Sequence, residues 1–319
     1  MKQVLRSLLG YAAPSLFAAA LGGCAPTIAL DQPDVILPTS FESKPAVTAN
    51  QGVSLDRWWD NFHDPQLTGL ISTALERSTT ARLAYARIME ARALRSLDRA
   101  STLPSGSLSG TATVQGSEAL WGAGVSQGGQ DSYRANFTPN WEVDVFGRLA
   151  AIRNRADLDY AASALDFHAA RLALAADVAV SLFQSRFIAA QLVDAQDALR
   201  IAKELADAAA LGQSHGITAG QDVARLTADV ASAEAEVARL SGNLQSARRS
   251  LLILIGDPAA PTDSLPIEAK LDAPPAVPGI APGVLLTRRP DVLSAEIALQ
   301  SAAQTVQIDR LALFPQFNI

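Results

Sequence analysis

The segment Asn136-Phe-Thr-Pro-Asn-Trp-Glu-Val-Asp-Val145 alternates between polar and apolar side chains without a break. Strict alternation predicts a β-strand, in which successive side chains point to opposite faces. One predicted face is apolar, and the other carries amides, a hydroxyl and the carboxylates of Glu142 and Asp144. A strand of about ten residues with two such faces suits the wall of a β-barrel with lipid outside and water inside. We therefore expect Glu142 and Asp144 to face the lumen of a barrel.

A second alternating segment, Ser107 to Gln115, is the predicted partner of this strand. Its apolar members are Leu108, Gly110, Ala112 and Val114. Between the two segments, residues 116–131 are rich in Gly, Ser and Gln, as in the long external loops of outer-membrane barrels. A solvent-exposed sheet of a soluble protein is the alternative, but it leaves Phe137 and Trp141 facing water together.

The predicted strand leads directly into long helices. From Arg148 to about residue 211 the pattern is helical, which corresponds to about 95 Å at roughly 1.5 Å per residue. Within it, two series recur every seven residues: Leu158, Leu165, Leu172 and Ala179, and Ala162, Ala169, Ala176, Phe183 and Ala190. We expect these residues to form the packing seam of the helix.

A second long helix follows the break at Gly212 to Gly220. Its apolar residues keep an unbroken heptad spacing: Val223, Leu226, Val230, Ala233, Val237, Leu240, Leu244, Ala247, Leu251 and Leu254. Such a heptad predicts a coiled coil, and Gly256 and Pro258 end it. The two helices should form an antiparallel hairpin that turns at about Gln213 to Ala219. A long-helix bundle without any passage is the alternative.

The N-terminus resembles a bacterial lipoprotein signal. Lys2 and Arg6 precede an apolar run that ends in Leu21-Gly-Gly-Cys24, and Cys24 is the chain's one cysteine. The pattern predicts a diacylglycerol and an N-acyl chain on Cys24, which would anchor the protein to the membrane. Ala25 follows the cysteine, and by analogy with lipoprotein sorting in enteric bacteria the absence of Asp at this position favours the outer membrane. A free structural thiol is the alternative.

The remaining segments carry mainly structural signals. Trp58 and Trp59 are expected to be buried anchors, with a ligand platform as the alternative. Asp64 and Pro65 suit the start of a helix, a second helix should span about Thr80 to Ser101, and Pro290 should open a helix that ends near Leu313. The predicted segments are a signal peptide (1–23), a tether (24–55), periplasmic helices (56–105), a β-barrel hairpin (106–146), a long helical hairpin (147–256), a proline-rich connector (257–283) and the start of a second repeat (284–319).

That second repeat rests on an internal similarity. Leu97-Asp-Arg-Ala-Ser-Thr-Leu-Pro104 resembles Ile308-Asp-Arg-Leu-Ala-Leu-Phe-Pro315, 211 positions further on. Both copies are predicted to be a helix that stops at proline before a strand begins. A tandem duplication, of which the sequence contains only the beginning of the second copy, explains the match. Chance similarity is the alternative.

Composition and motifs argue against several classes of function. The net charge of −6 disfavours nucleic-acid binding, which needs a basic face. His63, His168 and His215 lack metal-ligand spacing, and no phosphate-binding glycine loop occurs. Gly212-Gln-Ser-His-Gly216 spells a nucleophile-elbow pattern, but it lies between predicted helices rather than after a strand. We expect no catalytic residues, no metal and no cofactor other than the lipid on Cys24.

Five stretches resemble the TolC-like outer-membrane factor family, in the lipoprotein (NodT-type) branch that serves tripartite efflux pumps of the resistance-nodulation-division type. They are the lipobox ending at Cys24, Trp58-Trp-Asp-Asn-Phe-His-Asp-Pro65, Trp141-Glu-Val-Asp-Val-Phe-Gly-Arg148, Leu254-Ile-Gly-Asp-Pro258 and Leu285-Leu-Thr-Arg-Arg-Pro-Asp-Val292. The resemblance implies a mainly α fold with a transmembrane β-hairpin, in which coiled-coil helices of an α-barrel continue strands of an outer-membrane β-barrel.

The resemblance also implies function and partners. It implies a homotrimer that is anchored in the outer membrane, extends into the periplasm and acts as a passive exit duct for drugs or small solutes. The hairpin tip, here Gln213, Ser214, His215, Gly216 and Ile217, would dock on a periplasmic adaptor (membrane fusion protein), which connects to an inner-membrane pump.

Two departures from the family pattern keep alternatives open. The sequence lacks the second strand pair and second long hairpin of complete members, so no entrance-gate residues can be assigned. At the tip, Gly212, Ala219, Gly220 and Gln221 replace the usual residues, and only Asp222-Val223 remain. The alternatives are a lipid-anchored periplasmic coiled-coil or adaptor protein, and a truncated chain that does not assemble.

Overall fold

A computed structural model describes residue 38 and residues 55–113, 131–275 and 282–319. The described chain forms two compact units. The first contains residues 89–163 and 293–319, and the second contains residues 55–88 and 164–292. The predicted signal peptide, Cys24, nearly all of the tether and most of the predicted external loop lie outside the described residues.

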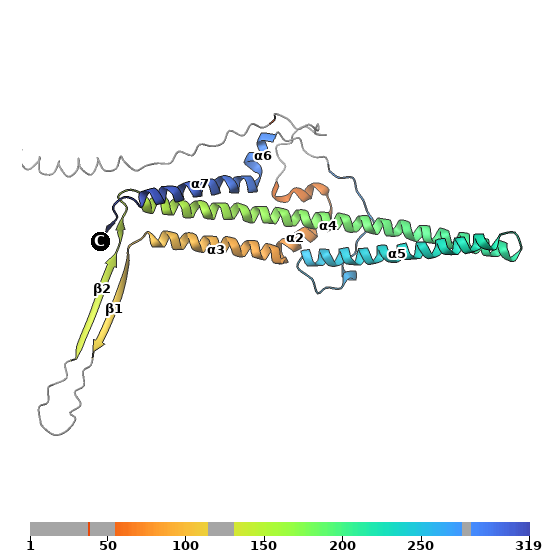
Figure 1. Ribbon diagram of the computed structural model, residues 1–319, viewed down its shortest axis with the longest axis horizontal. Helices are drawn as coiled ribbons and strands as arrows, with labels where there is room; N and C mark the ends of the chain where they lie inside the picture. The colour runs from red at the N-terminus through yellow and green to blue at the C-terminus, as the bar shows by residue number, and fades with distance from the viewer. Residues whose placement is uncertain (1–37, 39–54, 114–130, 276–281) are drawn as a thin grey trace, which may run out of the picture. The chain divides into compact units, whose positions relative to one another are not determined.

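The first unit contains the predicted strand pair. Strands β1 (Ser105–Thr113) and β2 (Ser132–Asn140) pair antiparallel, with Leu108 opposite Phe137 (Figure 1). This register places the apolar side chains on one face: Leu108, Ala112, Tyr133, Ala135, Phe137 and Pro139. The other face carries hydroxyls, amides and one guanidinium: Ser105, Ser107, Ser109, Thr111, Thr113, Ser132, Arg134, Asn136, Thr138 and Asn140. The predicted separation of polar and apolar faces is therefore confirmed.

The predicted strand Asn136–Val145 has different bounds in the structure. It begins earlier, at Ser132, and after Trp141 a short strand β3 (Glu142–Val143) pairs antiparallel with β4 (Phe317–Asn318). Trp141 and Ile319 exchange two backbone hydrogen bonds of 3.0 and 2.9 Å. Val145 lies beyond the strand, because the chain already turns toward the next helix there. Trp141 thus lies in an extended ribbon and not in a helical core.

Three helical segments complete the first unit: the end of α3 (Thr79–Ser101), the start of α4 (Arg148–Ser214) and most of α7 (Pro290–Leu311). The predicted internal repeat is visible in their order. Helix α3 is followed by Pro104 and strand β1, and α7 is followed by Pro315 and strand β4. Helix α7 ends two residues before the predicted Leu313.

The second unit holds the main hydrophobic core. Its cluster joins η1 (Leu55–Phe62), α2 (Pro65–Arg77), the middle of α4 and the end of α5 (Gly220–Leu254), and its largest fully buried members are Leu67, Ile71, Leu174, Val178, Leu182 and Leu251. Trp59 is only 6% exposed and contacts Trp58 edge to face, with ring centroids 6.0 Å apart. The prediction that the tryptophans are packing anchors is therefore confirmed.

A buried ion pair ties α4 to the start of α2. Asp64 caps α2 as predicted and accepts from the Leu67 amide at 3.0 Å. Its second carboxylate oxygen pairs with Arg186, which is 4% exposed. Arg186 also donates to Gln66 at 2.8 Å, and Gln66 donates to the Pro266 carbonyl at 2.7 Å. One arginine thus links α4, α2 and the proline-rich segment.

The coiled-coil prediction is right for α5 and only partly right for α4. All ten heptad residues of α5 are buried or half-buried, while most residues between them are exposed. In α4 the residues of both predicted series are also buried or half-buried, but further buried residues lie outside them, namely Leu174, Ala175, Val178 and Leu182. The reason is that α4 packs against η1 and α2 along this part, so no single heptad seam describes it.

Two further segments differ in detail from the prediction. A short helix α6 (Pro282–Arg288) precedes α7, and a 3-10 turn η2 (Thr262–Ser264) lies in the proline-rich connector. Among the described helices, α4 is long and apolar enough by length and composition to cross a membrane. Core helices of soluble proteins pass the same test, and 44% of the most apolar window of α4 is buried.

Candidate functional site

The first candidate site is the join between strand β3 and helix α4, which contains both predicted lumen residues. Asp144 accepts hydrogen bonds from the Leu149 amide at 3.0 Å and the Ala150 amide at 2.8 Å. The first amides of a helix have no partner within it, so a carboxylate at this position caps α4. Gly147, with φ of 85°, provides the left-handed bend just before the helix.

The second acidic residue, Glu142, is bound to Arg148 on the first turn of α4. The Arg148 Nε donates to one Glu142 oxygen at 2.9 Å, and a terminal nitrogen contacts the other. Arg153 approaches Asp144 at 3.9 Å. Both acids are therefore compensated by arginines of the same chain. Whether they line a lumen stays a prediction, but they do not provide free negative charge.

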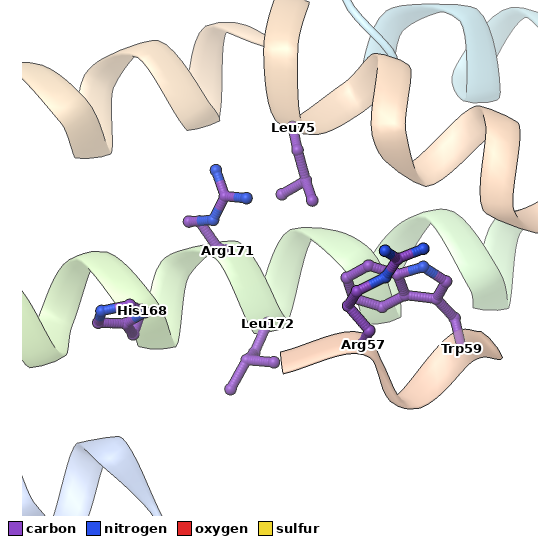
Figure 2. Close-up of a pocket in the computed structure, with 6 residues that line it drawn as sticks. All are labelled: Arg57, Trp59, Leu75, His168, Arg171 and Leu172. Atoms are coloured by element: carbon purple, nitrogen blue, oxygen red, sulfur yellow. The ribbon is translucent and has the colours of Figure 1, made fainter. Parts of the chain in front are cut away.

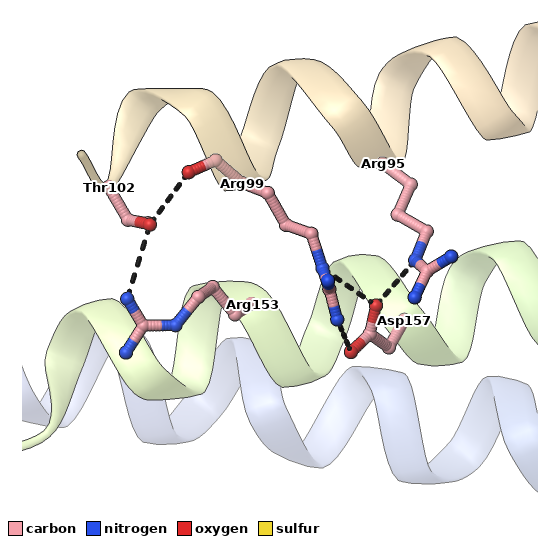
Figure 3. A network of polar contacts seen from close by, with 5 residues as sticks. All are labelled: Arg95, Arg99, Thr102, Arg153 and Asp157. Carbon is pink, nitrogen blue, oxygen red and sulfur yellow. Dashed lines mark hydrogen bonds and ion pairs between the residues drawn. The ribbon is translucent and has the colours of Figure 1, made fainter.

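Next to this join, a polar network holds α3 against α4 (Figure 3). Asp157 accepts from Arg95 Nε at 2.6 Å and from two nitrogens of Arg99 at 3.1 and 2.6 Å. Arg153 donates to the Thr102 hydroxyl at 3.2 Å. The hydrogen bond from Arg99, with help from Arg95, lowers the pKa of the Asp157 carboxyl. Sequence reasoning missed this network, because arginines spaced along an exposed helix face give no sign of their partner.

The second candidate site is the tip of the helical hairpin. Helix α4 ends at Ser214, and Gly216 has φ of 73°. The Ile217 amide donates to the Gly212 carbonyl at 2.8 Å, and the Gly216 amide donates to Gln213 at 2.9 Å. This pair of bonds is a Schellman motif. It leaves Ile217 82% exposed at the tip, so the turn presents an apolar side chain to solvent.

The tip also carries the nucleophile-elbow pattern, and its local structure differs from an elbow. Ser214 lies at the end of a helix, and its hydroxyl donates to the Leu211 carbonyl at 2.7 Å. An elbow instead holds its serine at a strand-to-helix turn. Among the described residues, no three His, Cys, Asp or Glu side chains gather to hold a metal ion.

A shallow pocket of about 230 Å³ lies in the second unit (Figure 2). Arg57 and Trp59 of η1, Leu75 of α2, and His168, Arg171 and Leu172 of α4 line it. Arg57 is paired with Asp60 at 2.9 Å, and Arg171 lies over the Phe167 ring at 5.6 Å. The pocket therefore combines cationic and apolar side chains, and none of the described residues that line it is a carboxylate, a serine or a cysteine.

Comparisons with known proteins agree with these features. Residues 70–257 match the family model described as outer membrane efflux protein. The pyoverdine export outer membrane protein OpmQ of Pseudomonas putida is 30% identical over 89% of this chain and 62% of its own length. The probable outer membrane lipoprotein SilC of Salmonella typhimurium is 27% identical over 90% of this chain and 62% of its own length.

The fold is that of solved outer-membrane channels. The outer-membrane channel OprN superposes with a TM-score of 0.75 at 25% identity, over 92% of this chain and 66% of that structure. The mainly helical architecture with a strand pair is therefore confirmed. The chain spans less than two thirds of the length of the two curated relatives named above.

Proposed function

Because the chain belongs to the outer membrane efflux protein family, we propose that it is a channel subunit of a tripartite efflux system. In this role it provides a passive exit for drugs or other small solutes across the outer membrane, and energy is supplied elsewhere. The single observation that carries the proposal is the β1–β2 hairpin. Its register gives one apolar and one hydroxyl- and amide-lined face, and its second strand continues through β3 into α4.

The exposed apolar face supports a position in lipid. Leu108, Tyr133 and Phe137 are 79%, 76% and 67% exposed, and large apolar side chains grouped on one strand face are costly in water. In a barrel wall the same face contacts lipid, while the opposite face contacts water. Glu142 and Asp144 would line the water side at the periplasmic end of the hairpin, with their charges offset by Arg148 and Arg153.

The membrane anchor and the partners complete the proposal. Cys24 would carry the diacylglycerol and the N-acyl chain, a role supported by the lipobox pattern and by a relative named as an outer membrane lipoprotein. The tip residues Gln213 to Ile217 would contact a periplasmic adaptor, because the Schellman turn presents Ile217 there. The adaptor would connect to an inner-membrane pump. We further propose a homotrimer without enzymatic activity.

Purification and conductance test the proposal directly. The full chain should sediment with the outer-membrane fraction, migrate as an oligomer that resists mild heating in detergent, and conduct ions in a planar bilayer. A lipid-anchored coiled-coil or adaptor protein would instead be a peripheral monomer without conductance. Recovery of only that monomer, under conditions in which a complete family member assembles, would overturn the duct.

A further inference from the structure

We infer that Arg134 sets the fixed charge on the water-facing side of the β-hairpin, and that it favours anionic over cationic solutes there. The inference rests on the proposed function as a duct, because only a lumen makes this face a conduction path. It differs from the sequence-based expectation, which placed the charge of the lumen on Glu142 and Asp144.

The register of the hairpin places Arg134 on the polar face. Arg134 lies opposite Thr111, and its neighbours along the two strands on that face are hydroxyls and an amide: Ser109, Thr113, Ser132 and Asn136. Its side chain is exposed. It is the one charged residue within β1 and β2, so nothing on these two strands offsets it.

Among the described residues, the acids at the two ends of this face do not pair with Arg134. Asp131 is exposed and lies outside β2, and no ion pair joins it to Arg134 in the described chain. At the other end of the ribbon, Glu142 is held by Arg148, and Asp144 caps α4 and faces Arg153. Two acids and two arginines leave that end close to neutral. The uncompensated charge of the described polar face is therefore positive.

A single guanidinium per subunit is enough to matter in a narrow passage. A ring of charged side chains selects ions in a pore, and its field reaches about 8 Å at physiological ionic strength. An arginine stays protonated throughout the accessible pH range. The preference for anions should therefore persist between mildly acidic and mildly basic pH, unlike a preference set by histidine.

Reversal potentials under a potassium chloride gradient test the assignment. Replacing Arg134→Gln should lower the chloride-to-potassium permeability ratio about two-fold or more, and Arg134→Glu should lower it further. The matched control is Arg225→Gln, because Arg225 is an exposed arginine of α5, 68% accessible, in the other unit. Control and wild type should agree. A ratio that is the same in all four proteins would overturn the inference, while the duct itself would stand.

Cysteine labelling separates failure of the inference from failure of the duct. In intact outer membranes, a charged, membrane-impermeant thiol reagent should modify Arg134→Cys and leave its lipid-facing neighbour Tyr133→Cys unmodified, with the unsubstituted chain as background. If this labelling pattern is found but the protein does not conduct, the proposed function as a duct is wrong, and the inference that rests on it fails with it. If the reagent modifies Tyr133→Cys but not Arg134→Cys, the orientation given to Arg134 is wrong, whether or not the protein conducts ions.

Discussion

Asp64 carries out two tasks at once, since it caps α2 and compensates the buried guanidinium of Arg186. Burial on its own would raise the pKa of the Asp64 carboxyl, but hydrogen bonds from Arg186 and the Leu67 amide outweigh it. The pKa therefore lies below its ordinary value of 3.8. A carboxyl with a lowered pKa in the folded state stabilises the fold above its unfolded pKa, and this stability is lost as the pH falls through the folded pKa.

Thermal melting in detergent tests this carboxylate. The wild type should keep its Tm from neutral pH down to about pH 5 and lose stability below about pH 4. Asp64→Asn should be less stable at pH 7 by about 3 kcal/mol or more, because it leaves Arg186 buried without a counter-charge, and its Tm should change less with acid. Asp197→Asn, an exposed control, should follow the wild type. An unchanged Tm in Asp64→Asn at pH 7 would contradict the role given to the pair.

Gly256 is a second residue on which the core depends. It has φ of 85°, and a Cβ at this position would lie 2.5 Å from the Arg77 carbonyl oxygen. Gly256→Ala should therefore cost more than the 1–3 kcal/mol, roughly, of a strained backbone alone. Gly242→Ala on α5 is the matched control, because nothing lies within 4 Å of its added methyl, and it should stabilise the protein by about 0.5–1 kcal/mol. Equal denaturation midpoints of the two variants would contradict this prediction.

At the scale of elements, the strand-to-helix join depends on its charges. Glu142→Lys would place a third cation beside Arg148 and Arg153, so it should lower the Tm. The charge-swapped double variant Glu142→Lys with Arg148→Glu should recover part of the loss, since it restores a pair of opposite charges. Thermal melts of the wild type, of Glu142→Lys, of Arg148→Glu and of the double variant give the coupling. If Glu142→Lys melts like the wild type, the pair does not hold the join, and a change of ion selectivity in that variant could be attributed to charge alone.

The elements also show what sequence patterns determine in this chain. The alternating segments predicted the hairpin and its two faces, and the α5 heptad predicted its buried side, because one side chain pattern holds along the whole length of each. Helix α4 packs against several elements, so spacing alone could not predict the buried residues that lie outside its two heptad series. The pairing of Glu142 with Arg148 was hidden for another reason. It depends on the bend at Gly147, which returns the chain so that residues on either side of the strand end meet.

At the scale of the whole molecule, the described strands need more neighbours than they have. They form two two-stranded sheets, β1 with β2 and β3 with β4, and their outer edges carry unpaired backbone groups. In lipid such groups are costly unless further strands pair with them. The proposed trimer supplies strands from other copies, so assembly and membrane insertion should be coupled. Isolated monomers should not remain in the outer membrane as stable species.

The two faces of the hairpin provide the sharpest test of this coupling. Phe137→Lys places a charge on the apolar face, where a lysine at the bilayer midplane costs about 2–4 kcal/mol per subunit. These costs add over the subunits of an oligomer. Thr138→Lys places the same charge on the polar face one residue away, where water can solvate it. The first variant should lose the heat-resistant oligomer from the outer-membrane fraction, and the second should keep it. If both variants assemble equally well, Phe137 does not face lipid. If Thr138→Lys alone fails, the two faces have been assigned the wrong way round, and the water-filled path would have to lie on the side of Leu108 and Phe137.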